Sequence, residues 1–158
     1  MQNWEKALAK FLKKYEKEPF FEGALLGGSY ASGNQNAFSD IDVDILISDT
    51  QNWRERGNVE VDGFLIEYFE NPIKQIRKEF ENDLKKGRTN AVNRFSYGKI
   101  IADRTGNVKK LQKEASAFLK KSMPKYKRSD FTFDFYAAWD LMDELESLSR
   151  DKKMLFLV

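Results

Sequence analysis

The chain has 158 residues, of which 41% are hydrophobic, and its 27 basic and 25 acidic residues give a net charge of +2. A chain of this length and apolar content forms one folded domain, or one domain plus part of a second, and its charge is no argument for or against binding to nucleic acid. The sequence has neither cysteine nor histidine. It therefore excludes disulfides, thiolate and Ser-His-Asp catalysis, and metal sites built on sulfur or imidazole. A bound metal would have oxygen ligands, which suits magnesium, manganese or calcium.

The N-terminal segment predicts an amphipathic helix over residues 3–17, closed by Pro19. Its apolar residues, from Trp4 to Tyr15, recur at spacings of three and four, as the buried stripe of a helix requires. Charged residues interrupt any apolar core, so the segment is not a secretory signal. No apolar run approaches the roughly 20 residues that span a bilayer. We therefore expect a cytoplasmic protein without a membrane span.

Two strands follow, and the second carries a row of acids. The first is predicted at residues 22–27, and the second ends near Ser48. Because strand side chains alternate between two faces, Asp40, Asp42 and Asp44 fall on one face. Three carboxylates on one face repel each other and resist burial, a cost that a divalent cation removes. Acids at this spacing can bind one or two magnesium ions together with substrate phosphates, so we predict a cation site here.

The turn between these strands has the composition of a phosphate-binding loop, Gly27-Gly28-Ser29. Glycines let a phosphate approach the backbone, and the freed amides and the serine hydroxyl donate hydrogen bonds. The pattern is not a P-loop, because no Gly-Lys-Ser/Thr follows. A phosphate loop beside paired acids predicts phosphoryl or nucleotidyl transfer.

A β-hairpin is predicted next. Residues 49–57 form a polar connection, and Asp62-Gly63 then lies between two strand-like runs, which is a strong signal for a tight turn. The second arm places Glu67 on one face with Leu65 and Phe69, as a lone acid between apolar neighbours. Glu67 either serves the cation site or is an ordinary glutamate at a sheet edge.

Helices are predicted for the following part of the chain. Asn71 and Pro72 have the residue types of an N-cap and a first-turn proline, and Gly87 ends that helix. Further helices are predicted at residues 89–101, where Gly98 is unfavourable, and at residues 107–121. The helix at 89–101 would bury three apolar residues, namely Val92, Phe95 and Ile100.

The C-terminal part begins with a basic, proline-containing segment at residues 120–130, which we interpret as a linker, with a phosphate- or RNA-contacting loop as the alternative. A long helix from Phe131 to about Arg150 follows, and the last five residues, MLFLV, are apolar. Such an ending predicts a truncated helical domain or a patch that another subunit covers. We therefore expect one domain at residues 1–121 and a C-terminal helical segment at residues 122–158, through which a homodimer or a separate helical partner would bind.

The stretch GSYASGNQNAFSDIDVDILI resembles the signature of the nucleotidyltransferases of the DNA polymerase β superfamily, specifically of the minimal and antibiotic-modifying branch. That signature is Gly-Ser, ten residues, then Asp-any-Asp within strand-forming aliphatics, and here it falls on Gly28, Ser29, Asp40 and Asp42. Ser39, before the first acid, also fits and is expected at the nucleotide site. The resemblance covers residues 1–121 and implies a polymerase β-like α+β fold, in which helices pack on a small mixed sheet.

The resemblance also implies a reaction. A nucleoside monophosphate is transferred from a nucleoside triphosphate (NTP) to a hydroxyl of a small molecule or protein, with two Mg²⁺ or Mn²⁺ ions as cofactors. Asp40 and Asp42 would bind the metal, and Gly28 and Ser29 would position the β and γ phosphates. In the family a third carboxylate from a later strand completes the metal site and helps deprotonate the acceptor, and Glu67 is the matching position.

Five further residues are secondary candidates. Asp44 rivals Glu67 as the third acid, although the family usually has no catalytic acid at that position; we expect it to accept a backbone hydrogen bond or to contact the metal indirectly. Gly27 belongs to the phosphate loop. The remaining three either contact phosphates or acceptor or are solvent-facing charges: Arg88, Arg94 and Lys99.

Three alternatives stand beside the enzyme. One is an antitoxin-like interaction protein that pairs with a helical partner, which is compatible with catalysis because antitoxins of this family can modify their partner. The second is a non-catalytic nucleotide-binding protein, and the third is an α/β domain whose acids bind calcium adventitiously. The sequence does not define the acceptor or the preferred NTP.

Overall fold

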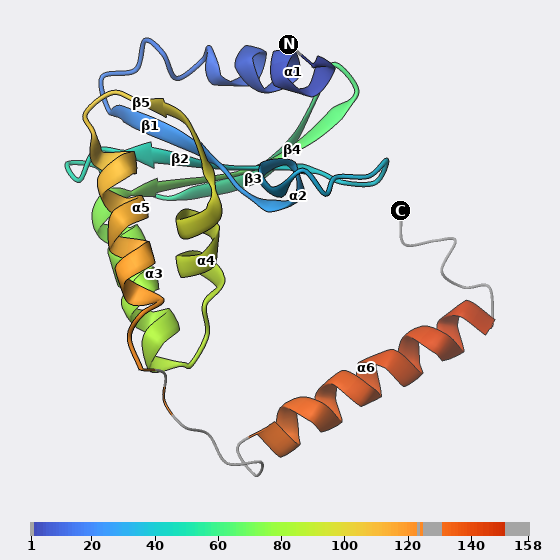
Figure 1. Ribbon diagram of the computed structural model, residues 1–158. Helices are drawn as coiled ribbons and strands as arrows, with labels where there is room; N and C mark the ends of the chain where they lie inside the picture. Colours follow the sequence, from blue (N-terminus) through green and yellow to red (C-terminus); the bar gives the residue numbers. More distant parts are fainter. Residues whose placement is uncertain (1, 123, 125–130, 151–158) are drawn as a thin grey trace. The chain divides into compact units, whose positions relative to one another are not determined.

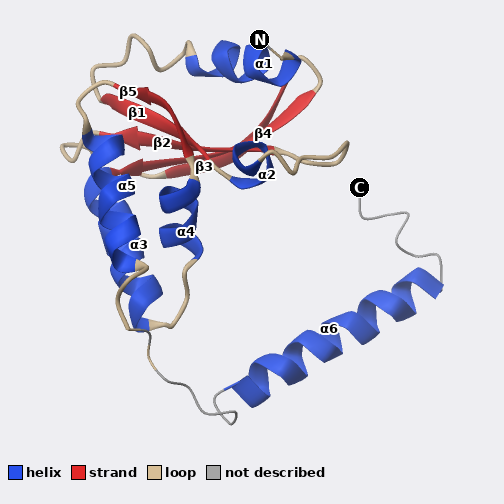
Figure 2. Ribbon diagram, in the orientation of Figure 1, coloured by secondary structure: helices blue, strands red, loops and turns tan. Residues whose placement is uncertain are grey.

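The computed structural model describes residues 2–122, 124 and 131–150 of the chain and divides into two compact units, Met1–Pro124 and Lys125–Val158, which are described separately. The first unit is an α+β domain, as predicted (Figure 2). Its elements in chain order are α1 (Asn3–Leu12), β1 (Phe21–Leu26), α2 (Gly28–Ser32), β2 (Ile41–Ile47), β3 (Glu55–Val61), β4 (Phe64–Pro72), α3 (Ile73–Lys85), α4 (Asn90–Tyr97), β5 (Lys99–Asp103) and α5 (Asn107–Phe118).

The sheet is mixed and has five strands in the order β3-β4-β2-β1-β5. Neighbouring strands are antiparallel except for β2 and β4, which are parallel and aligned so that Asp42 lies beside Glu67. The small mixed sheet of the prediction is therefore confirmed. The parallel pair is the feature that brings two distant acidic positions together, because it places β4 directly against the acidic strand.

Helices cover both faces of the sheet. Helix α1 packs on one face, and α3, α4 and α5 pack on the other (Figure 1). Val43 and Ile45 of β2 point to one face of the sheet and lie in the core beneath α1. Leu46 points to the other face and lies in the core with α3 and α4. Since side chains alternate along a strand, Asp42 and Asp44 share the face of Leu46. The acids therefore lie on the side of the sheet that carries α3–α5.

The hairpin between β3 and β4 forms as predicted. Asp62 and Gly63 both have positive φ, of 51° and 81°, as a type I′ turn requires. Its register pairs Asn58 with Glu67 and Arg56 with Phe69. The strand β3 starts at Glu55, so the predicted polar connection at residues 49–57 is shorter than expected.

The prediction of a helix over residues 89–101 is wrong in its second half. Helix α4 ends at Tyr97, and Gly98 leads into the edge strand β5, which pairs with β1. Val92 and Phe95 are buried as expected, but Ile100 is 37% exposed. A Cβ at residue 98 would lie 2.3 Å from a side-chain carbon of Leu25, so the close approach of β1 favours glycine at this turn.

Other boundaries also differ from the predictions. Helix α1 ends at Leu12 rather than near residue 17, and α5 ends at Phe118 rather than at residue 121. Asn71 is not the N-cap of α3. It lies in β4, and its Oδ1 accepts a hydrogen bond from Arg54 Nε at 2.7 Å, while the first turn of α3 is capped by Asp49, whose Oδ1 accepts from the Lys74 N–H at 2.6 Å.

The second unit contains the predicted long helix, α6 (Thr132–Arg150). Large apolar side chains are exposed along it, including Phe133, Tyr136, Trp139 and Met142. The basic linker at residues 120–130 lies largely outside the described residues, and the apolar ending MLFLV lies wholly outside them. Among the described residues, no helix combines the length and the apolar character that crossing a bilayer demands.

Candidate active site

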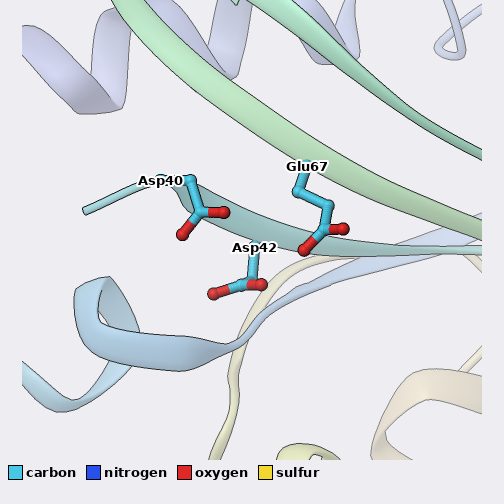
Figure 3. Close-up of side chains that lie close together, drawn as sticks. All are labelled: Asp40, Asp42 and Glu67. Atoms are coloured by element: carbon cyan, nitrogen blue, oxygen red, sulfur yellow. The ribbon is translucent and has the colours of Figure 1, made fainter. Parts of the chain in front are cut away.

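Three carboxylates meet where β2 and β4 run side by side. Asp40 directly precedes β2, Asp42 lies within it, and Glu67 lies on β4 beside Asp42. One carboxylate oxygen from each residue lies within 4.8 Å of the others. Figure 3 shows the three carboxylates directed toward a common space, and all three residues are partly exposed. A cation could reach this space from solvent.

The electrostatics of the three acids favour a cation. The pKa of Asp42 is raised, first by burial and then by the negative charges of Asp40 and Glu67, while the Arg94 guanidinium acts in the opposite direction. A divalent cation would reverse this repulsion, and carboxylate oxygens are the ligands that Mg²⁺ and Mn²⁺ prefer. The residues present therefore fit a divalent metal ion.

The glycine loop is packed directly on Asp42. The Gly27 N–H donates a hydrogen bond of 2.9 Å to the backbone carbonyl of Asp42. Gly28 has φ of +58°, and a Cβ there would lie 1.9 Å from Asp42 Oδ2. Residue 28 must therefore be glycine for two reasons, the left-handed backbone and the contact with the carboxylate.

The two serines of the motif lie at either end of the loop between β1 and β2. Ser29 is in the first turn of α2, directly after the glycines, and is partly exposed. Ser39 Oγ accepts a hydrogen bond of 2.9 Å from the Asn36 N–H, which fixes the chain just before Asp40. Ser29 therefore follows the glycines directly, and the hydrogen bond of Ser39 fixes the backbone that leads to Asp40.

Comparison with known proteins agrees with this geometry. The family model of the nucleotidyltransferase domain matches residues 5–102, which is more than half of the chain and includes all three acids. The chain belongs to this nucleotidyltransferase family, within the DNA polymerase β superfamily.

The fold of the nucleotidyltransferase domain also resembles a solved structure. A nucleotidyltransferase-like protein from Exiguobacterium sibiricum 255-15 superimposes with a TM-score of 0.56 at 14% sequence identity. The match covers 72% of this chain and 39% of that chain, so our chain spans well under half of the similar protein. At this identity the likeness concerns the fold alone. A search of curated proteins found no significant match.

The third aspartate of the acidic strand lies apart from the three clustered carboxylates. Asp44 is 1% exposed, and its Oδ2 lies 2.8 Å from Nε of Arg94 on α4. Burial raises the pKa of Asp44 to about 7, although the Arg94 guanidinium acts in the opposite direction. Its partner is thus an arginine, rather than the backbone group or metal that the sequence led us to expect.

The other two basic candidates of this nucleotidyltransferase domain are exposed. Arg88 precedes α4, and with Arg94 it lines a cavity of about 240 Å³. Lys99 is the first residue of β5 and pairs with Leu26, next to the glycine loop. Both remain candidates for contact with an anionic substrate.

Sequence reasoning missed Arg56, which touches the third acid. Its Nε and Nη2 donate hydrogen bonds of 3.1 and 2.6 Å to Glu67 Oε1, and its guanidinium lies 4.8 Å from the ring centroid of Phe69. Counting back from the predicted turn would have found it. A two-residue hairpin sets Asn58 opposite Glu67 and hence Arg56 diagonally across from it, within reach of a long side chain.

Proposed function

We propose that the protein is a Mg²⁺-dependent nucleotidyltransferase that moves a nucleoside monophosphate from an NTP to a hydroxyl group of a small molecule or a protein. The observation that carries this proposal is the cluster of Asp40, Asp42 and Glu67, with carboxylate oxygens within 4.8 Å of one another and a glycine loop packed on its centre. Membership of the nucleotidyltransferase family supports it.

The metal site would consist of Asp40, Asp42 and Glu67. Mg²⁺, as two ions, or Mn²⁺ would supply positive charge that neutralises phosphate oxygens and the developing charge of the transition state. The raised pKa of Asp42, caused first by burial and then by the charges of Asp40 and Glu67, supports the assignment. Our proposal does not include Asp44 among the metal ligands, because its carboxylate forms an ion pair with Arg94.

The protein's own groups would have three tasks. The backbone of Gly28 and the hydroxyl of Ser29 would donate hydrogen bonds to the β and γ phosphates, with Gly27 and Ser39 holding the loop in place. The acceptor oxygen would form a bond to the α phosphorus as the bond to the bridging oxygen breaks, and pyrophosphate would leave. Glu67 would take the proton of the acceptor hydroxyl, since the chain has no histidine to act as base.

Label transfer tests the proposal directly. The purified chain would be incubated with each NTP labelled at the α phosphate, with Mg²⁺, and with acceptors from several classes: aminoglycosides, lincosamides, proteins and tRNA. We expect the label to move to one class of acceptor, and to do so only when a divalent cation is present. Transfer that persists in Asp42→Asn, or in excess chelator, would contradict the proposal.

A second candidate function is interaction with a helical partner, with or without catalysis, in the manner of an antitoxin. The exposed aromatic residues of α6 favour it, because a solvated helix rarely displays so many. In this proposal residues 1–121 are the nucleotidyltransferase domain and residues 122–158 are a helical interaction segment. Light scattering after gel filtration distinguishes the cases for self-association: a dimer that Trp139→Lys converts to monomer supports a homodimer, and a wild-type monomer excludes it.

A further inference from the structure

Arg94 occupies a central position between the glycine loop and the acidic strand. It lies in the middle of α4, and its Nε is 2.8 Å from Asp44. A Cβ placed on Gly27 would lie 3.0 Å from Arg94 Cγ, so the arginine stem packs against the loop itself. The guanidinium also lies 4.5 Å from the ring centroid of Phe69, and its charge opposes the rise in the pKa of Asp42 that burial and the neighbouring acids cause. Its charge is therefore within range of the metal-binding acids as well as of Asp44.

The ion pair leaves part of this guanidinium available. The ion pair is made through Nε, 2.8 Å from Asp44 Oδ2, and in the described part of the chain this N–H has no well-aligned hydrogen bond. The Arg94 side chain is 25% exposed, whereas that of Asp44 is 1% exposed. Arg94 lines a cavity of about 220 Å³ together with Gly27 and Gly28. An anion in that cavity would lie between Arg94 and the backbone of the loop.

Stability alone gives little reason for this pair. Burying two opposite charges costs about as much in lost hydration as their attraction returns, and an apolar pair of the same volume is often equally stable. Neither oxygen of Asp44 has a well-aligned hydrogen bond, so the carboxylate is held at a cost. A fixed arginine, by contrast, is useful in a site that binds phosphates, because its planar fork matches two phosphate oxygens.

We infer that Arg94 binds the polyphosphate of the nucleotide from the side of α4, opposite the amides of the glycine loop, and that Asp44 is a positioning residue that fixes its orientation. The inference rests on the proposed function, which supplies the nucleotide. It also gives the third aspartate a role: Asp40 and Asp42 would bind the metal, and Asp44 would orient the arginine.

Binding measurements on the full chain test this role without turnover. Calorimetric titrations of ATP, GTP, CTP and UTP, each with Mg²⁺ and without acceptor, would be compared with titrations of the matching nucleosides. We expect Arg94→Gln to weaken binding of the preferred NTP by about 10- to 100-fold, the value of a charge-assisted hydrogen bond, and to leave nucleoside binding unchanged. Arg94→Lys keeps the charge without the fork and should lose less.

Asp44→Asn tests the positioning role. It should weaken NTP binding about 3- to 10-fold in the wild-type background, since a misplaced arginine retains part of its attraction, and should have no effect in the Arg94→Gln background. The control is Arg77→Gln, which breaks a more exposed arginine–carboxylate pair between α3 and α5, with Nε 2.9 Å from Glu114 Oε2. It should lower the melting temperature and leave NTP affinity unchanged.

The outcomes separate the two proposals. NTP binding by the wild type that is unchanged in folded Arg94→Gln or Arg94→Lys overturns the role of Arg94 and leaves the proposed function standing. Equal effects of Asp44→Asn in both backgrounds overturn the positioning role. If the wild type binds none of the four NTPs, the proposed function itself fails.

Discussion

Asp42 and Asp44 are the same residue type on the same strand, but their surroundings differ. Asp42 lies near the start of β2, is partly exposed, and faces two further carboxylates, whereas Asp44 lies two residues on, is fully buried, and faces an arginine. Both side chains point to the same face of β2, so the strand alone does not distinguish them. The difference comes from the residues packed on that face: α4 places Arg94 against Asp44, whereas Asp42 faces the glycine loop and solvent. A row of acids thus divides into a proposed cation site and the counter-ion of an arginine.

The largest effect is expected from Asp42→Asn. It removes a carboxylate from the centre of the proposed metal site, so Mg²⁺-dependent NTP turnover should fall by at least about 100-fold, as when a preorganised electrostatic group is lost. Folding should be retained, because the substitution removes a charge that burial and the nearby Asp40 and Glu67 both disfavour. Steady-state turnover and thermal unfolding, measured on the same sample, check both parts; retained turnover would contradict the catalytic assignment.

Glu67→Gln separates the roles of the two strands. If Glu67 takes the acceptor proton, the rate should fall by about 100-fold while nucleotide affinity changes little. Single-turnover rates and equilibrium binding of the NTP measure the two quantities independently. An unchanged rate would move the role of third acid to Asp44 and remove the contrast between Asp42 and Asp44.

The glycine loop offers a matched pair of substitutions. Gly28→Ala and Gly33→Ala each place a side chain at positive φ, which costs about 1–2 kcal/mol of unfolding free energy. Only the first collides with Asp42, since nothing lies within 4 Å of a Cβ at Gly33. We expect Gly28→Ala to lose more stability than Gly33→Ala in urea titrations, and to lose turnover as well. Equal losses of stability and activity would show that the contact with Asp42 is unimportant.

The smallest effect concerns pH. The pKa of Asp42 in the folded, metal-free protein is raised above its ordinary value of 3.8. Because the folded state then holds the proton more tightly than the unfolded state, this carboxyl contributes stability below pH 3.8 that is lost as pH rises through its raised pKa. Binding of Mg²⁺ requires the deprotonated form, so metal affinity should fall as pH drops through the same interval. Unfolding curves from pH 3 to pH 7, with and without Mg²⁺, should differ between wild type and Asp42→Asn; identical pH dependence would contradict the assignment.

The sequence predicted the local parts of this fold well. The hairpin at Asp62-Gly63, the glycine loop and the acidic strand each depend on residues close together in the chain, and all are found where expected. The apolar spacing from residue 89 continues through Ile100, which extended the predicted helix too far. Gly98 carried the contrary signal, but pairing of β5 with β1 is a contact between distant segments that the spacing cannot reveal.

The candidate site was predictable to a similar degree. The Gly-Ser and Asp-any-Asp spacing located the acids on β2, while the alignment of Glu67 with Asp42 depends on the parallel pairing of β2 and β4, which resemblance to the family suggested and local pattern did not. The partner of Asp44 could not be predicted, because which helix covers which end of a strand is decided by tertiary packing. Arg94 was one of three equivalent basic candidates until α4 was in place.

Binding of Mn²⁺ in the absence of nucleotide distinguishes Asp42 from Asp44 without any turnover. Free Mn²⁺ would be measured by electron paramagnetic resonance during titration of the wild type, Asp42→Asn and Asp44→Asn. We expect that the wild type and Asp44→Asn bind Mn²⁺ with similar affinity and that Asp42→Asn does not bind it. Loss of binding in Asp44→Asn, or binding that survives in Asp42→Asn, would contradict the division of the strand into a metal site and a counter-ion.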